Sequence, residues 1–403
     1  MTKIISIDQI ASYVSIEAAW KKIWSGSRPK SKDTEGVDGL CLNDFSVSPK
    51  PRIKAISFAL QKRSYEFSDL KAHLVPKPNG KKRLICVPTV NDRIVQRALL
   101  NFLNVKYGAR FKNKISYGFI QERTVTEAAR EACRLRQKSN WAFKTDISAF
   151  FDNVDRQQLN QKIKSVVRDR SLHNLLLAAV SCEIEPQKSK SNNRHIKELG
   201  IENGKGIRQG MPLSPFFANL FLESFDKEIM KAGYKAIRYA DDLIFFADSY
   251  EDCLIIDRFC RESLLKLNLE IPELSKVDSK SIIAKPHERI EFLGLGLSPI
   301  EGRYELILTK EQRHSIYTEL MSLSSINELL ARNKKFADLG RTISSRIAGY
   351  HSAYAPVVSN YTELQKDLEN IHQKILKEIY GKDGLGIDLK SLSKEKRTFL
   401  GIL

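Results

Sequence analysis

Short apolar runs separated by turn positions dominate the middle of the chain and predict strands joined by tight turns. Ala236–Arg238 and Leu243–Phe246 flank the segment Tyr239–Asp242, which carries two adjacent acids. This pattern predicts a hairpin with the acids at its tip. A third apolar run, Trp141–Thr145, predicts a strand that ends just after Asp146. Upstream, the turn signal at 78–80 lies between two further strand-like runs.

Helical periodicity marks the segments around this centre. Ser214 and Pro215 predict a helix start, with Ser214 as the N-cap and Pro215 in the first helical position. The apolar residues that follow at helical spacing are expected in the core: Phe217, Leu220, Phe221 and Phe225. Near the C-terminus, one apolar stripe of an amphipathic helix is formed by Leu364, Leu368, Ile371, Ile375 and Ile379.

The remaining segments give weaker signals. A short helix containing Trp20 and Trp24 is expected near the N-terminus, and a flexible basic stretch, 25–32, follows it. Residues 185–205 are polar and charged, which favours a surface loop, with RNA contact as an alternative. A helical region is predicted over 306–403.

Composition narrows the class of protein. The 403 residues are 42% hydrophobic, so two or three packed subdomains are possible. Lys and Arg outnumber Asp and Glu by 66 to 48, a formal charge of +18, which favours a polyanionic partner such as nucleic acid. The basic residues are spread along the chain, so a merely soluble basic protein is the alternative.

Other compositional features exclude several classes. The six Cys form no Cys-x-x-Cys pair and the seven His have no ligand-like spacing beside them, which argues against a zinc site or disulfide scaffold. We expect reduced cysteines in a cytoplasmic protein. Neither a signal peptide nor an apolar run of about 18 residues is found, so no membrane contact is expected.

The acids carry the candidate chemistry. Two carboxylates side by side are unfavourable unless a cation binds between them. A lone Asp-Asp pair or a lone strand-end Asp is most simply a solvated turn residue. Together, however, Asp146, Asp241 and Asp242 on neighbouring strands can hold two hard divalent cations. One ion activates an attacking hydroxyl, and the other neutralises a triphosphate and its leaving pyrophosphate.

Several blocks then occur in the order found in bacterial reverse transcriptases related to group II intron enzymes, which this chain resembles. The resemblance runs from about residue 34 to residue 296. The blocks are Gly36–Gly39, His73–Ile85, Val87–Gln96, the Asp146 strand, Gly206–Pro215, Tyr239–Asp242 and Phe292–Gly294.

This resemblance implies an α+β fold, a right-hand polymerase with fingers, a palm of antiparallel sheet plus helices, and a helical thumb. The expected division is an N-terminal extension at 1–33, fingers at 34–135, palm at 136–305, thumb at 306–380 and a C-terminal tail at 381–403. A weak thumb-like segment, Ser345–Tyr354, supports the fourth part.

The resemblance also implies the site residues. Asp146, Asp241 and Asp242 would be catalytic and would bind two Mg²⁺ ions. Lys77 and Arg83 would lie over the incoming deoxynucleoside triphosphate, whereas a solvated basic loop is the alternative for that hairpin. Gln209 would contact the sugar and base. Phe151 would be the steric gate against a ribose 2′-OH, with Phe150 a core residue on the opposite face of the strand.

The partners expected from the resemblance are an RNA template and a DNA product. The endonuclease residue spacing is missing after residue 306, and so are the Asn-Ala-x-x-His and Val-Thr-Gly blocks of retron enzymes. This favours a stand-alone antiphage defence enzyme that copies a dedicated, structured non-coding RNA. A group II intron enzyme lacking its endonuclease is the alternative. A non-catalytic RNA-binding module is a third hypothesis, which the three intact acids oppose. The oligomeric state stays open.

Overall fold

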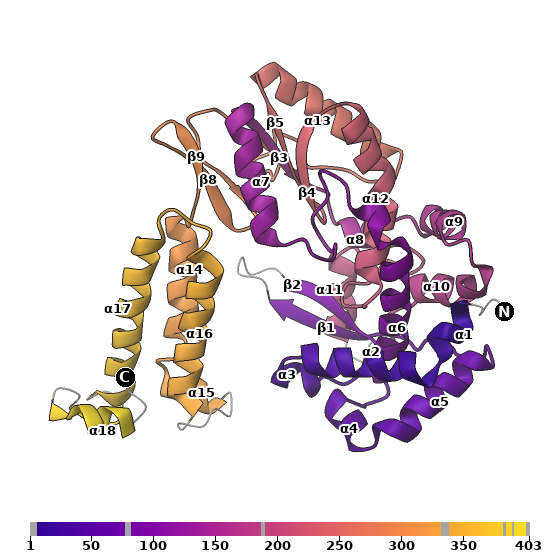
Figure 1. The fold of residues 1–403 in the computed structure, drawn as a ribbon, viewed down its shortest axis with the longest axis horizontal. Helices are drawn as coiled ribbons and strands as arrows, with labels where there is room; N and C mark the ends of the chain where they lie inside the picture. The colour runs from indigo at the N-terminus through magenta and orange to yellow at the C-terminus, as the bar shows by residue number, and fades with distance from the viewer. Residues whose placement is uncertain are drawn as a thin grey trace. The chain divides into compact units, whose positions relative to one another are not determined.

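The structure of the chain, a computed structural model, describes residues 6–76, 82–186, 190–331, 338–381, 384–388 and 391–399 (Figure 1). The chain divides into two compact units. The first contains residues 1–124, 143–245 and 251–282, and the second contains residues 125–142, 246–250 and 283–403. The five-part division expected from the sequence stays a prediction.

The N-terminal part of the first unit is helical. Its helices are α1 Ser6–Ala11, α2 Tyr13–Gly26, α3 Pro29–Lys32, α4 Leu42–Val47, α5 Pro49–Gln61 and α6 Val90–Tyr107, followed by the 3₁₀ turn η1 Gly108–Phe111. Helix α2 confirms the helix expected around Trp20 and Trp24. Part of the following stretch, expected to lack regular structure, is the short helix α3, which Pro29 starts at its first position.

A β-hairpin follows these helices in the same unit. Strands β1 Lys71–Pro76 and β2 Lys82–Val87 pair antiparallel, with Leu74 opposite Leu84. This confirms the predicted pair of strands. The turn between them, with Lys77, lies outside the described residues.

The segment at 185–205 is more ordered than the sequence suggested. It contains helix α11 Lys190–Glu198, so the loop prediction was wrong there. Ile196, together with Leu199 and Ile201, packs against an apolar cluster that includes Leu84 of the hairpin. Ile196 is the one apolar residue of α11, so no apolar periodicity in the sequence predicts this helix.

The largest sheet in the described residues has four strands, in the order β4-β5-β3-β6. The strands are β3 Trp141–Asp146, β4 Lys235–Tyr239, β5 Asp242–Ala247 and β6 Ile282–Ala284. The three predicted strands beside the acids, β3, β4 and β5, are confirmed.

Helix α12 Ser214–Lys231 supplies the core of the first unit. The four predicted core residues, Phe217, Leu220, Phe221 and Phe225, are all buried. The predicted N-cap is off by one residue, because Leu213 is the N-cap. The Ser214 hydroxyl instead donates to the carbonyl of Arg208 at 2.7 Å and anchors the preceding loop.

The rest of the first unit consists of short helices: α8 Phe150–Asn153, α9 Arg156–Val166, η2 Arg170–Leu172, α10 His173–Val180 and most of α13 Tyr250–Leu265. Helix α8 corrects one prediction. Phe150 and Phe151 lie on a helix and not on opposite faces of a strand, because the chain leaves β3 at Asp146 and turns through Ala149 at φ 43°.

The second unit combines a small antiparallel sheet with helices. Its elements are α7 Val125–Lys138, β7 Ile290–Phe292, β8 Leu295–Ile300, β9 Arg303–Ile307, α14 Lys310–Met321, α15 Ile326–Ala331, α16 Leu339–Tyr354, α17 Tyr361–Tyr380 and α18 Lys394–Phe399. Helix α17 packs against α14 and α16 (Figure 1). Its predicted stripe is confirmed, since all five residues are buried.

Two expectations about chemistry and environment can be compared with the structure. All six cysteines are free thiols, as predicted, and five of them are buried. Every helix within the described part of the chain is too short or too polar to span a bilayer.

Candidate active site

The catalytic candidates Asp241 and Asp242 lie where the sequence placed them, at the turn between β4 and β5. The turn is formed by Ala240 and Asp241, and Asp242 is the first residue of β5. Ala240 has φ 58°, which a residue with a Cβ adopts rarely. The turn therefore needs support from neighbouring groups.

Asp146 approaches this turn from the neighbouring strand. Strands β3 and β5 are adjacent in the sheet. The amide of Ile147, the residue after Asp146, donates to the carbonyl of Asp241 at 3.1 Å. The structure thus brings the ends of both acid-bearing segments together, as the sequence predicted.

Two of the three acids, Asp241 and Asp242, have raised pKa values. Burial, followed by the charge of Asp241, raises the pKa of Asp242 to about 6, and Lys144 partly offsets this rise. Burial also raises the pKa of Asp241, and the Asp146 charge adds to the rise. Like charges held in a half-buried place favour protonation unless a cation is added.

Asp146 has a basic partner that sequence reasoning missed. Its side chain is 12% exposed, and its Oδ2 accepts a short contact from the ammonium of Lys280. Its Oδ1 is buried and has no hydrogen-bond partner among the described residues. Lys280 lies in a polar segment with Lys276, and nothing in the local sequence pattern distinguishes it from a solvated lysine.

These observations test whether the acids suit a divalent metal. Carboxylate oxygens are the ligands that Mg²⁺ prefers, and the unpartnered Oδ1 of Asp146 is available to accept a cation. Among the residues the structure describes, no set of three acidic, imidazole or thiol side chains is already arranged as a metal cage. The donor types fit Mg²⁺, and Lys280 holds one of the oxygens that a metal would share.

Two further candidates, Arg83 and Gln209, lie on β2 and on the loop before α12. The carbonyl of Gln209 accepts from the amide of Cys86 at 2.7 Å, which ties the Gln209 loop to β2. Gly210 has φ 107°, and a Cβ there would lie 2.4 Å from the Cys86 carbonyl. Only glycine permits this approach. Gln209 is half-buried, whereas Arg83, also on β2, is exposed and lowers the pKa of Asp241 through its charge.

Phe151 lies on α8, beside the same loop. The amide of Ile207 donates to the Phe151 carbonyl at 2.7 Å. The Phe151 ring is half-buried and meets the ring of Phe119 edge-on, with 6.5 Å between centroids. Phe150 is buried, so the expected contrast between the two rings holds although their backbone is helical.

The structure therefore gathers six of the seven predicted site residues within the first unit, on β2, β3, α8, the Gln209 loop and the β4–β5 hairpin. Lys77, the seventh, lies outside the described residues. A family of known proteins shares this set of blocks. The model of the reverse transcriptase (RNA-dependent DNA polymerase) family matches residues 75–297, more than half of the 403 residues. The chain belongs to this family, and its fold is the α+β right-hand polymerase fold.

Curated relatives agree with the family. Protein YkfC of Escherichia coli (strain K12) is 27% identical over 206 residues, covering 49% of this chain and 50% of YkfC. The group II intron-encoded protein LtrA of Lactococcus lactis subsp. cremoris is 26% identical over 231 residues, covering 56% of this chain and 35% of LtrA. The Retron Ec83 reverse transcriptase of Escherichia coli is 26% identical over 182 residues, covering 43% of this chain and 52% of the retron enzyme. The chain thus spans about half or less of these relatives.

Solved structures give only a distant likeness. A partial Cas6-RT-Cas1–Cas2 complex matches with a TM-score of 0.39 at 23% identity, covering 65% of this chain and 41% of that chain. Apo telomerase from Candida tropicalis, truncated from its C-terminal domain, matches with a TM-score of 0.41 at 14% identity, covering 62% of this chain and 59% of the telomerase chain.

Proposed function

We propose that this protein is an RNA-directed DNA polymerase that makes cDNA from an RNA template by nucleotidyl transfer. The observation that carries the proposal is the approach of Asp146 to Asp241 and Asp242 on adjacent strands, in a chain of the reverse transcriptase family. The raised pKa values of the last two acids indicate a place that needs added positive charge.

Each residue then has a role. Asp146 and Asp241 would hold two Mg²⁺ ions, with Asp242 beside them. When bound, these ions would activate the primer hydroxyl and neutralise the triphosphate and the leaving pyrophosphate. Arg83 would present its planar fork to the phosphates, which a lysine cannot do. Lys77 would assist from the same hairpin, and Gln209 would contact the sugar and base.

Phe151 would choose the sugar. Its backbone carbonyl is bonded to the Gln209 loop, and its half-buried ring packs edge-on against Phe119. A ribose 2′-OH would collide with this ring and a deoxyribose would not. The enzyme would therefore use deoxynucleotides and reject ribonucleotides.

Primer extension on an RNA template tests the activity. We expect Mg²⁺-dependent incorporation of deoxynucleotides, lost in Asp241→Asn by on the order of 1,000-fold or more with RNA binding nearly intact. Asp248→Asn is a matched control, because Asp248 follows the other end of β5 and accepts from Ser139. Full activity of Asp241→Asn, or equal loss in Asp248→Asn, would contradict the proposal.

The biological setting is a further part of this proposal. A formal charge of +18 exceeds what one nucleotide site needs. We infer that the protein acts in the cytoplasm in antiphage defence and copies one structured non-coding RNA, recognised through shape and 2′-hydroxyls. The likeness to LtrA favours a second candidate, an intron-encoded enzyme without an endonuclease. A non-catalytic RNA-binding module is the third, and the extension assay tests it.

Sequencing of the nucleic acid that co-purifies with the protein separates these settings. The defence proposal predicts one predominant RNA and cDNA that maps to it, encoded beside the gene without ribozyme domains. Intron RNA in that position would favour the second candidate. A broad mixture of cellular RNAs and equally mixed cDNA would remove the dedicated template.

A further inference from the structure

A buried arginine lies three residues before Asp241. Arg238 is on β4 and is 1% exposed. An arginine placed in a buried strand is costly unless its charge and all its N–H groups find partners. Its partner is Asp226 of α12, 3% exposed, with which it forms a two-pronged ion pair at 2.6 Å (Nε–Oδ1) and 2.5 Å (Nη2–Oδ2).

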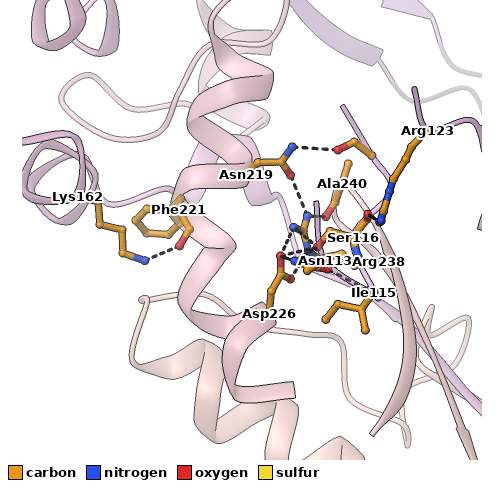
Figure 2. A network of polar contacts seen from close by, with 11 residues as sticks. Asn113, Ile115, Ser116, Arg123, Lys162, Asn219, Phe221, Asp226, Arg238 and Ala240 are labelled. Carbon is orange, nitrogen blue, oxygen red and sulfur yellow. Dashed lines mark hydrogen bonds and ion pairs between the residues drawn. The ribbon is translucent and has the colours of Figure 1, made fainter. Parts of the chain in front are cut away.

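The other N–H groups of Arg238 are also used (Figure 2). Nη2 donates to the hydroxyl of Ser116 at 2.9 Å. Nη1 donates to Oδ1 of Asn219 at 3.3 Å and to the carbonyl of Ala240 at 3.0 Å. Asn219 lies on α12, on the same face as Asp226. The guanidinium therefore joins helix α12 directly to the turn that carries the catalytic acids.

The contact with Ala240 is the one that matters for the site. Ala240 holds the unusual φ of 58°, and its carbonyl belongs to the peptide group that leads into Asp241. A residue in such a conformation persists only when its surroundings fix it. The Arg238 guanidinium fixes this peptide from the buried side of the turn.

The backbone around Arg238 is clamped as well. Its amide donates to the carbonyl of Ile115 at 2.7 Å, and its carbonyl accepts from the amide of Tyr117 at 2.8 Å. A Cβ on Gly118 would lie 2.2 Å from the amide nitrogen of Ala240, so this segment lies directly against the turn. Both backbone bonds come from the segment 115–117, and together with the side-chain contacts they define the position of the Arg238 guanidinium.

We propose that Arg238 is a positioning residue, which fixes the Ala240–Asp241 peptide through the Ala240 carbonyl and so aims the Asp241 carboxylate for cation binding. It touches neither substrate nor metal. The proposal rests on the proposed function of Asp241. It goes beyond that function by assigning the geometry of the hairpin to one buried side chain and its partners on α12.

Arg238→Lys separates positioning from folding. A lysine keeps a positive charge beside Asp226 but cannot supply five donors in a planar fork, so the contact with Ala240 is lost. Partners that orient metal ligands typically contribute 10–100-fold to metal affinity or activity. We therefore expect Mn²⁺ binding, followed by the electron paramagnetic resonance of free Mn²⁺, to weaken by about tenfold. The Mg²⁺ concentration for half-maximal extension should rise by a similar factor.

Arg136→Lys is the matched control. Arg136 is also buried, and its guanidinium donates to the carbonyls of Leu297, Lys285 and Glu288, none of which belongs to the hairpin. This variant should lose thermal stability while its Mn²⁺ affinity and Mg²⁺ requirement stay as in the wild type.

The outcomes distinguish this proposal from the proposed function. A wild-type protein that binds Mn²⁺ but extends no primer would contradict the polymerase assignment alone. Wild-type Mn²⁺ affinity in folded Arg238→Lys would overturn the positioning role alone. If Arg238→Lys fails to fold, the double variant Arg238→Met with Asp226→Leu takes its place, because it removes the contact with Ala240 and leaves no buried unpaired charge. A similar weakening of Mn²⁺ binding is then expected, and unchanged binding would overturn the proposal.

Discussion

Two charged clusters occupy the same hairpin and are built in opposite ways. Around Arg238, one guanidinium and one carboxylate balance each other, and the five N–H groups all have acceptors. Around Asp241, three carboxylates gather, one oxygen of Asp146 has no hydrogen-bond partner in the described part of the chain, and the pKa values of two acids are raised.

The difference shows how a fold can hold an unfavourable site. A satisfied buried network is rigid, because each group fixes its partners. A cluster of half-buried like charges is unstable by itself but ready to bind a cation. The satisfied Arg238 network lies next to the turn that carries Asp241. It can therefore hold the acids in position when no cation is bound to offset their repulsion.

The largest expected effect comes from breaking the satisfied cluster. Arg238→Met should lower the free energy of unfolding by about 3–5 kcal/mol, because it leaves the charge of Asp226 buried and unpaired. Urea unfolding measures this loss. Replacing both partners, as Arg238→Met with Asp226→Leu, should recover much of it.

The acid cluster supplies the contrast. Asp242→Asn should leave the stability of the metal-free protein unchanged or slightly raised, because it removes repulsion. Equal destabilisation by Arg238→Met and Asp242→Asn would mean that the two clusters do not differ as described.

Substitution of Phe151, a candidate site residue, should change the selectivity for the sugar and leave stability nearly intact. Phe151→Ala should raise ribonucleotide incorporation relative to deoxynucleotide incorporation by roughly tenfold to a hundredfold, since it opens space for the 2′-OH. Single-nucleotide extension measures the ratio. Phe150→Leu, in the buried neighbour, should lower stability without this change. Wild-type use of both sugars would defeat the interpretation.

Arg83 tests the phosphate side of the acid cluster. Arg83→Ala should raise the KM for deoxynucleotides roughly tenfold, because one charge-assisted hydrogen bond contributes about 1.5–3 kcal/mol. RNA binding should weaken less. Lys82→Ala is the control, since successive residues of a strand point to opposite faces. Unchanged nucleotide kinetics would return Arg83 to a solvated basic loop.

The smallest expected effect is on pH dependence. Because the pKa of Asp242 is raised from 3.8 to about 6, the folded protein holds this proton more tightly than the unfolded chain does. Metal-free protein should therefore lose stability as pH rises from about 4 to 6, by a few degrees in Tm. Asp242→Asn should lack this decrease. If the Tm of both proteins instead rose equally between pH 4 and pH 6, the predicted loss of stability from Asp242 would be wrong.

Much of the acid cluster could be predicted from sequence, because local signals define it. Two apolar runs around Tyr239–Asp242 predict a hairpin, and the run before Asp146 predicts a strand end. The Arg238 cluster gives no such local signal. Arg238 was included in an apolar run, and its partners come from α12 and from residue 116, which only the folded chain brings together.

Some missed features did leave traces in the sequence. Asn219 and Asp226 are seven residues apart, two helical turns, so their polar side chains share one face of α12, and both are buried. That spacing indicates a buried polar partner. Lys280 left no comparable trace, since its contact with Asp146 is long-range. The helix in the 190–198 segment was missed because charged residues outnumber its apolar positions.

The most direct measurement is a structure with primer and RNA template, a deoxynucleotide and Mn²⁺, located by its anomalous scattering. The account predicts Mn²⁺ within about 2.5 Å of carboxylate oxygens of both Asp146 and Asp241, with the Lys280 ammonium moved away from Asp146. Mn²⁺ bound only to the nucleotide, with Lys280 still paired to Asp146, would contradict the claim that these acids form the metal centre.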